Sequence, residues 1–431
     1  MRIRTLSFAL ALIGAATVSA EVKFDKMFAD STLRIDYITG GNATESHIML
    51  RGQSRRPGWT GRRHNLDRLL LTGNGTVTVC DSLTGDTIYR HSFSTLFREW
   101  QSTPEAKVTS KSFENTFLVP LPRRTAIITV ELLNDRHERV ASNSHFYSPQ
   151  DILVKPAAPA SPAPARYIHK GGSPEESIDI AILAEGYTPD RMEEFYAYAR
   201  KAVDEMLTYE PYRSYHDKFN FIAVATPSAD STLTVPRDGK WTDTAFGSHF
   251  DTFYSDRYLT SPNVFAMHDA LEQVPYEHII ILANSPVYGG GGIYNSYMLA
   301  TTRNKWFLPV IVHEFGHSFA GLADEYFYEG DVMEDSYPLD VEPWEPNITT
   351  LVDFPSKWQK MLKKDTPIPT VPADSAKYPV GVYQGGGYTF KGVFRPADRC
   401  RMRDNTWPTF CPVCTAAIEK LILFSTETKT R

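Results

Sequence analysis

The residues of this chain that could do chemistry together are two histidines and a glutamate within five positions, His313-Glu314-x-x-His317. Residues i and i+4 of a helix share one face, so a helix here would bring both imidazoles to a single metal ion. Glu314 lies between them, where it can act as general base on a metal-bound water. The spacing predicts one catalytic Zn²⁺ bound by His313 and His317.

A third metal ligand is expected just after this helix. Gly321 is placed to end the helix, because glycine commonly follows the last helical turn, and the reversed chain can return to the same metal. Asp324, three residues after that glycine, is the favoured third ligand, and the adjacent Glu325 is the alternative. The acid that does not bind the metal is expected to accept a hydrogen bond from a histidine. More distant acids stay eligible as the ligand: Glu334, Glu342 and Glu345.

Alternating strands and helices surround the motif and must position it. Apolar runs predict strands at 178–184, 219–225 and 278–283. An edge strand is expected at 293–300, entered through the glycines of 289–292. Helices are predicted at 188–209, at 305–321 and around 414–423. The expected architecture of residues 168–431 is therefore an α/β (α+β) domain, a twisted mixed sheet with helices packed on it.

The part before this domain has a different pattern. Period-2 and β-branched runs separated by Gly and Asn turns predict an all-β sandwich at 21–153. Four prolines among alanines in 156–165 predict an extended linker, placed at 154–167. The chain is therefore expected to be multidomain, with the β-sandwich first and the mixed-sheet domain last.

The first twenty residues have the features of an export signal. Arg2 and Arg4 precede an apolar run, and small residues end at Ala20, so 1–20 is predicted to be a signal peptide. A lipoprotein anchor is not expected, because no cysteine lies near Ala20. No integral membrane segment is expected after cleavage, because no later segment is apolar for ~18 residues. The mature protein is therefore predicted to be secreted, periplasmic or cell-surface associated. The net charge of −6 without any basic block makes nucleic acid an unexpected partner.

Four cysteines and an acidic segment complete the candidate functional residues. An exported protein can keep disulfides, and three cysteines lie near the C-terminus, so one bridge among Cys400, Cys411 and Cys414 is expected. Cys80 is expected to be a buried free thiol. An acidic cluster is predicted to be a solvated loop, with Ca²⁺ binding as the alternative: Glu329, Asp331, Glu334 and Asp335.

The string H-E-F-G-H-S-F-A-G-L-A-D-E-Y from His313 to Tyr326, with the β-domain before it, resembles the IgA-peptidase family of secreted bacterial zinc metallopeptidases. It also resembles the metzincin pattern H-E-x-x-H-x-x-G-x-x-H/D, although Gly321 and Asp324 each fall one residue late. The resemblance implies a zincin-type catalytic domain, one zinc ion, a water nucleophile and peptide hydrolysis. It further implies a methionine turn below the metal, for which Met402 is the candidate, and host immunoglobulin as a partner.

Three functions remain open at this point. The favoured one is an exported zinc endopeptidase, whose protein or peptide substrate pairs with the edge strand and whose oxyanion is stabilised by Tyr326, Tyr383 or Tyr388. A second is an adhesin-like binding protein whose peptidase domain is vestigial. A third is a zinc hydrolase acting on cell-wall peptide or glycan, because specificity depends on loops that the sequence does not assign.

Overall fold

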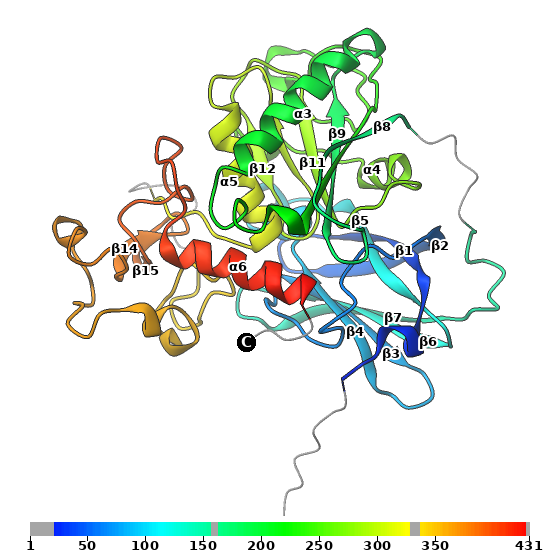
Figure 1. Ribbon diagram of the computed structural model, residues 1–431, viewed down its shortest axis with the longest axis horizontal. Coiled ribbons are helices and arrows are strands. Elements are labelled where there is room, and N and C mark those ends of the chain that lie inside the picture. The colour runs from blue at the N-terminus through cyan, green and yellow to red at the C-terminus, as the bar shows by residue number, and fades with distance from the viewer. Residues whose placement is uncertain (1–20, 157–162, 328–336, 428–431) are drawn as a thin grey trace, which may run out of the picture.

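The computed structural model describes residues 21–156, 163–327 and 337–427. Figure 1 shows an N-terminal β-rich domain in blue and cyan, and a C-terminal domain whose sheet and main helices are green and yellow. The predicted signal peptide at 1–20 lies outside the described residues, as does part of the predicted linker. The same holds for the whole acidic cluster: Glu329, Asp331, Glu334 and Asp335.

Two antiparallel sheets build the N-terminal domain, in the orders β2-β1-β5 and β4-β3-β6-β7. The predicted sandwich is confirmed, and its alternating pattern is clearest in β6, where buried and half-buried residues alternate along the whole strand. Two short helices that were not predicted accompany the sheets, α1 (Phe24–Met27) and α2 (Leu96–Gln101). The strands are β1 (Phe28–Gly41), β2 (Ser46–Pro57), β3 (Gly75–Asp81), β4 (Thr87–Phe93), β5 (Lys111–Pro122), β6 (Ala126–Leu133) and β7 (Arg139–Tyr147).

The C-terminal domain contains a six-stranded mixed sheet in the order β12-β13-β11-β9-β10-β8. The four inner strands are parallel, and an antiparallel strand lies at each edge. All eight residues of β9 are buried, as expected of a strand covered on both faces. The predicted mixed sheet is therefore confirmed. Its strands are β8 (Ala165–Lys170), β9 (Ile178–Glu185), β10 (Phe219–Val224), β11 (His278–Ala283), β12 (Gly290–Gly292) and β13 (Met298–Thr301).

Helices cover both faces of this sheet. Ile180 and Ile182 of β9 belong to one core with side chains of α3 (Met192–Met206), α5 (Phe307–Ala320) and α6 (Pro412–Thr426). The alternate residues of β9 pack on the other face, in a core that includes α4 (Val264–Ala270). The helix carrying the His-Glu-x-x-His motif is therefore sandwiched between the sheet and the C-terminal part of the chain.

Two sequence-based boundaries differ from the observed ones. The predicted edge strand at 293–300 is shorter, beginning only at Met298, and it pairs on both sides, so the edge strand is β12 in the glycine run. Glycines lack the side chains from which strands are recognised, so the sequence does not predict a strand in the glycine run. Strand β8 begins at Ala165, inside the range expected to be linker, because it pairs with β10.

The C-terminal region after residue 337 has little regular structure before α6. It contains a two-stranded hairpin, β14 (Tyr383–Gly386) and β15 (Thr389–Arg395), which Figure 1 shows in orange beside the red α6. Among the described residues, no helix combines the length and apolar character needed to cross a membrane.

The two domains are joined by specific buried contacts. Asn295 donates a hydrogen bond to the Ser92 carbonyl (2.8 Å), and the Ser94 amide donates to the Tyr294 carbonyl (2.9 Å). At a second point, Asn65 donates to the carbonyl of Phe424 in α6 (3.0 Å). The N-terminal domain is therefore held against the segment between β12 and β13 and against the last helix.

Candidate metal centre

Helix α5 presents His313 and His317 one turn apart with their Nε2 atoms 3.0 Å from each other. The Nδ1 atom of His313 is 3.1 Å from the Arg401 carbonyl, and that of His317 is 2.6 Å from the Leu322 carbonyl. A carbonyl only accepts hydrogen bonds, so each Nδ1 carries a proton, and each Nε2 presents a lone pair whenever its imidazole is neutral. Two Nε2 atoms at this distance need either a proton or a metal ion between them.

Asp324 supplies the third group. Its Oδ1 atom is 3.0 Å from His313 Nε2 and 3.3 Å from His317 Nε2, yet it accepts no hydrogen bond among the described residues. Three ligands on a tetrahedral zinc at ~2.0–2.2 Å lie roughly 3.4 Å apart, close to these distances. The donor set therefore fits a zinc ion, which His313, His317 and Asp324 could hold.

The turn after α5 brings Asp324 there. Gly321 has φ 59°, and its amide and that of Leu322 close the helix by bonding to the His317 and Gly316 carbonyls (3.0 and 3.1 Å). The Leu322 carbonyl then orients His317 by accepting the hydrogen bond from its Nδ1. The side chain of Asn347 holds the next residue, accepting from the Ala323 amide and donating to its carbonyl (2.7 and 2.9 Å).

The charges of this cluster reinforce one another. Burial opposes a charged His317, but the neighbouring Asp324 carboxylate outweighs burial and raises the pKa of His317 to about 9. Burial likewise opposes a charged Asp324, and the two histidines outweigh it, so the pKa of Asp324 is well below its usual range. The site therefore attracts positive charge, and a bound metal would take the place of the histidine proton.

Glu314 lies on the same helix beside the edge strand. Burial raises the pKa of its carboxyl, which suits a group that must gain and return a proton near neutral pH. A Cβ on Gly290 of β12 would lie 2.7 Å from Glu314 Oε1, and one on Gly292 would lie 2.5 Å from the Glu314 carbonyl. Only glycines allow the edge strand to approach the helix this closely.

Met402 lies in a turn directly below the histidines. It is fully buried, and its Sδ would be 2.7 Å from a Cβ on Gly316, the residue before His317. The preceding residue, Arg401, provides the carbonyl that orients His313. The structure thus places Met402 where the resemblance to metzincins implied a methionine turn.

The hydroxyl of Tyr388 donates a hydrogen bond to Asp324 Oδ2. The Tyr326 hydroxyl lies 3.2 Å from the Tyr388 hydroxyl. Tyr388 has φ 64°, unusual for a bulky residue, and the Gly387 amide beside it donates to the Asp324 carbonyl (2.8 Å). Tyr388 therefore orients the Asp324 carboxylate. Tyr383, another tyrosine expected to bind the oxyanion, uses its buried hydroxyl on the Tyr378 carbonyl (2.6 Å), which removes it from that role.

The remaining acids considered as ligands lie elsewhere. Glu325 points away from the histidines into a buried cluster with three cysteines. Glu345 accepts from the Tyr337 hydroxyl (2.9 Å), and Glu342 accepts from the Asp353 amide (2.9 Å). Glu334 lies outside the described residues.

The expected disulfide is absent. All four cysteines of the chain are described and all are free, with Cys400 Sγ and Cys414 Sγ 3.7 Å apart. Spacing along the chain indicated proximity correctly, but it does not distinguish a bridge from a cluster of thiols. Cys80 is only half-buried in β3, so the expectation of a buried thiol is wrong. Its sulfur lies 3.7 Å from the Thr87 hydroxyl.

A groove of about 620 Å³ begins beside the edge strand. Tyr288, which precedes the glycine run, lies on one wall, and Asn405, three residues after Met402, donates to its hydroxyl (3.3 Å). Trp306 and Lys305, immediately before α5, also line it. The groove thus adjoins the strand, the helix and the turn that form the metal centre, and it could accommodate part of an extended ligand.

Sequence comparisons identify two related families. The model of the family described as IgA Peptidase M64 matches residues 167–378, and that of Peptidase M64 N-terminus matches residues 23–144. Together they match more than half of the chain and coincide with the two observed domains. The matched part includes the histidines, Glu314 and Asp324, and it ends before Met402 and the three clustered cysteines. The comparison with curated proteins finds no match.

Proposed function

Since the chain belongs to the IgA peptidase M64 family and is a peptidase, we propose that it is an exported zinc metalloendopeptidase. His313, His317 and Asp324 would bind the zinc ion. The single observation that carries this proposal is the convergence of two imidazole lone pairs and one carboxylate oxygen within 3.3 Å of one another. A metal ion would satisfy all three atoms at once.

A bound zinc ion would supply Lewis-acid activation of a water molecule and of the scissile carbonyl. Glu314 would accept the proton of that water and later deliver it to the leaving amine, as its burial and position on α5 suggest. Strand β12 would bind the substrate backbone, in place of the longer edge strand expected from sequence. Tyr326, whose hydroxyl lies beside that of Tyr388, is the remaining tyrosine for the oxyanion.

The proposal is tested with the purified mature chain and a broad library of quenched peptides. We expect cleavage inside peptides, loss of cleavage after chelation, and recovery when Zn²⁺ is added back. A protein that binds zinc without cleaving any peptide would instead support the binding-protein function, and cleavage confined to cell-wall fragments would support the third function. Immunoglobulin is included as one substrate among others.

Export is a separate part of the proposal, supported by the sequence of the first twenty residues. Expression in a bacterium with a secretory pathway should yield a protein outside the cytoplasm whose first residue is Glu21. Recovery of the full-length chain from the cytoplasm would contradict export and leave the peptidase proposal intact.

A further inference from the structure

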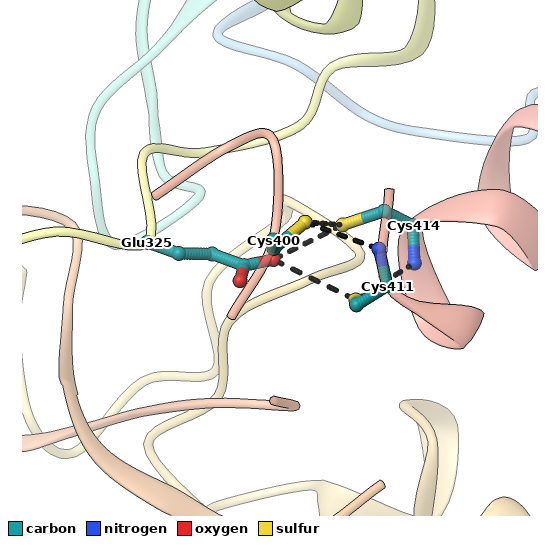
Figure 2. Close-up of side chains that lie close together, drawn as sticks. All are labelled: Glu325, Cys400, Cys411 and Cys414. Atoms are coloured by element: carbon teal, nitrogen blue, oxygen red, sulfur yellow. Dashed lines mark hydrogen bonds between the residues drawn. The ribbon is translucent and has the colours of Figure 1, made fainter. Parts of the chain in front are cut away.

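A second set of metal-ligand side chains lies behind the first. Glu325, Cys400, Cys411 and Cys414 each offer one ligand atom, and these four atoms all lie within 4.8 Å of one another. Figure 2 shows the four side chains converging. Glu325 lies in the irregular segment after α5, Cys400 lies in the turn before Met402, and Cys411 and Cys414 lie at the start of α6. Each of the four is at most 3% exposed.

Two of the distances in this cluster are close to those of tetrahedral coordination, and a third is shorter. The sulfurs of Cys400 and Cys414 are 3.7 Å apart, and Glu325 Oε1 is 3.0 Å from Cys414 Sγ and 3.9 Å from Cys411 Sγ. A tetrahedral zinc with Zn–S of ~2.3 Å and Zn–O of ~2.0–2.2 Å separates its ligand atoms by roughly 3.5–3.8 Å. A disulfide would instead need its sulfurs ~2.05 Å apart.

Backbone amides are directed at two of the three sulfurs. The Cys411 and Met402 amides point at Cys400 Sγ (3.2 and 3.5 Å), and the Cys414 amide points at Cys411 Sγ (3.4 Å). Backbone donors directed at ligand sulfur are the outer-shell contacts that metal–thiolate sites use.

The buried carboxyl group of Glu325 gives a second, independent indication that this cluster binds a cation. Asn347 donates to its Oε1 (3.1 Å), whereas Oε2 has no hydrogen-bond partner in the described part of the chain although the residue is fully buried. A buried carboxylate with an unpaired oxygen, packed against three thiols, is costly unless a cation joins them.

We propose that Glu325, Cys400, Cys411 and Cys414 bind a second metal ion, a structural Zn²⁺. All four positions are filled by the protein, which is the property of structural rather than catalytic sites. Three thiolates and one carboxylate select a soft, borderline cation of this kind over Ca²⁺ or Mg²⁺.

This second ion would stabilise the parts of the chain that hold the first one. Glu325 follows Asp324 directly, and its amide donates to the Met402 carbonyl (2.8 Å). Cys400 begins the turn whose Arg401 carbonyl orients His313. The Cys₃Glu site would thus link the segment that carries Asp324, the turn at Met402 and α6 behind the candidate active site.

The wild-type full chain gives the first test, by elemental analysis and by thiol titration in denaturant with chelator and without reductant. We expect two zinc ions per chain and four reactive thiols. A chain with one zinc ion, or with two thiols missing because Cys400 is bridged to Cys414 or Cys411, would overturn the proposal.

Variants separate the two sites. His317→Ala should keep one zinc ion and, when loaded with Co²⁺ alone, should show the near-ultraviolet thiolate-to-cobalt charge-transfer absorption. Cys411→Ser in that background should lose at least half of the absorption, while Cys80→Ser should leave it unchanged. Absence of the absorption from Co²⁺-loaded His317→Ala contradicts the second site only. Absence of peptide cleavage by the zinc-loaded wild type, with this absorption present in Co²⁺-loaded His317→Ala, contradicts the proposed function only.

Discussion

Gly290 is the residue whose replacement should most selectively damage the candidate active site. In Gly290→Ala the new Cβ would lie 2.7 Å from Glu314 Oε1 and 2.9 Å from Val310 Cγ1, so either β12 or the Glu314 carboxylate must move. A displacement of ~1 Å at a reacting group can cost about 100-fold in rate. We therefore expect kcat/KM to fall by about 100-fold, measured with the best peptide from the library.

The matched control is Gly52→Ala, since Gly52 also lies in a strand but no atom lies within 4 Å of its Cβ position. Both variants should retain the wild-type zinc content. Unchanged kcat/KM in Gly290→Ala would show that the edge strand does not constrain Glu314.

Tyr388 should act on zinc affinity through Asp324. Tyr388→Phe removes the hydroxyl that donates to Asp324 Oδ2 and leaves the backbone contacts of the loop in place. Loss of such an outer-shell partner typically weakens metal binding by about 10- to 100-fold. Competition with a chromophoric chelator measures the change.

Tyr254→Phe is the comparison for this variant, because that side chain is 84% exposed. Equal zinc affinity in the two variants would mean that the hydroxyl of Tyr388 does not position the ligand.

Spacing along the chain predicts which residues lie together where the determinant is local. His313 and His317 are one helical turn apart, and Gly321 alone reverses the chain, so the approach of Asp324 followed from spacing. The sequence names Tyr388 only as an oxyanion candidate and does not name Asn347. Their positioning roles are not visible in it, because they lie 64 and 24 positions from the residues they hold and resemble any other Tyr or Asn. The cysteines were expected to be close, but only coordinates reveal the buried Glu325 among them.

At the scale of elements, strand β9 should make the stability of the C-terminal domain depend on pH. Burial raises the pKa of Asp179 in β9 to about 7, although Asn220 donates to it (3.0 Å). The folded state therefore prefers the protonated acid, and its stability falls as pH rises from about 4 to about 7. Asp179→Asn should remove a destabilisation of up to roughly 4 kcal/mol above pH 7.

Thermal unfolding of Asp179→Asn and wild type at pH 5 and pH 8 measures this effect. The advantage of the variant should be larger at pH 8, and Asp204→Asn on the exposed face of α3 should show no such difference. Some pH dependence should survive, because burial also raises the pKa of the neighbouring Glu277. A greater advantage of Asp179→Asn at pH 5 would contradict the raised pKa of Asp179.

Element prediction depended on side-chain patterns. Strand β11 was placed at its observed bounds because its apolar run has no interruption. Strand β12 was missed because three glycines carry no pattern, and the same absence of side chains lets it contact α5. The strand most relevant to substrate binding is thus the one least visible in the sequence.

At the scale of the whole molecule, the two domains should unfold together. Arg56 of the N-terminal domain is buried, donates to the Leu271 and Val274 carbonyls (2.5 and 3.1 Å) and lies 4.6 Å from the centre of the Tyr276 ring. Arg56→Ala would leave buried carbonyls unpaired, at a cost of roughly 2–4 kcal/mol. We expect a lower melting temperature or two separate transitions by calorimetry.

Arg51→Ala, at an exposed position of the same strand, should unfold like wild type. If Arg56→Ala also unfolds like wild type, the domains do not depend on this contact. The Pro/Ala segment indicated a boundary but not the interface, because interface residues such as Arg56 have no distinctive sequence pattern.

The central claim is that Glu314 is the catalytic base of a zinc peptidase, and cleavage of one peptide by wild type and Glu314→Gln tests it most directly. Both proteins are first shown to carry equal zinc, since Glu314 is not among the ligands. Removing a general base costs about 100- to 10,000-fold, so we expect kcat to fall by at least 100-fold with little change in zinc content. Cleavage by Glu314→Gln at the wild-type rate, with zinc bound, would contradict the account.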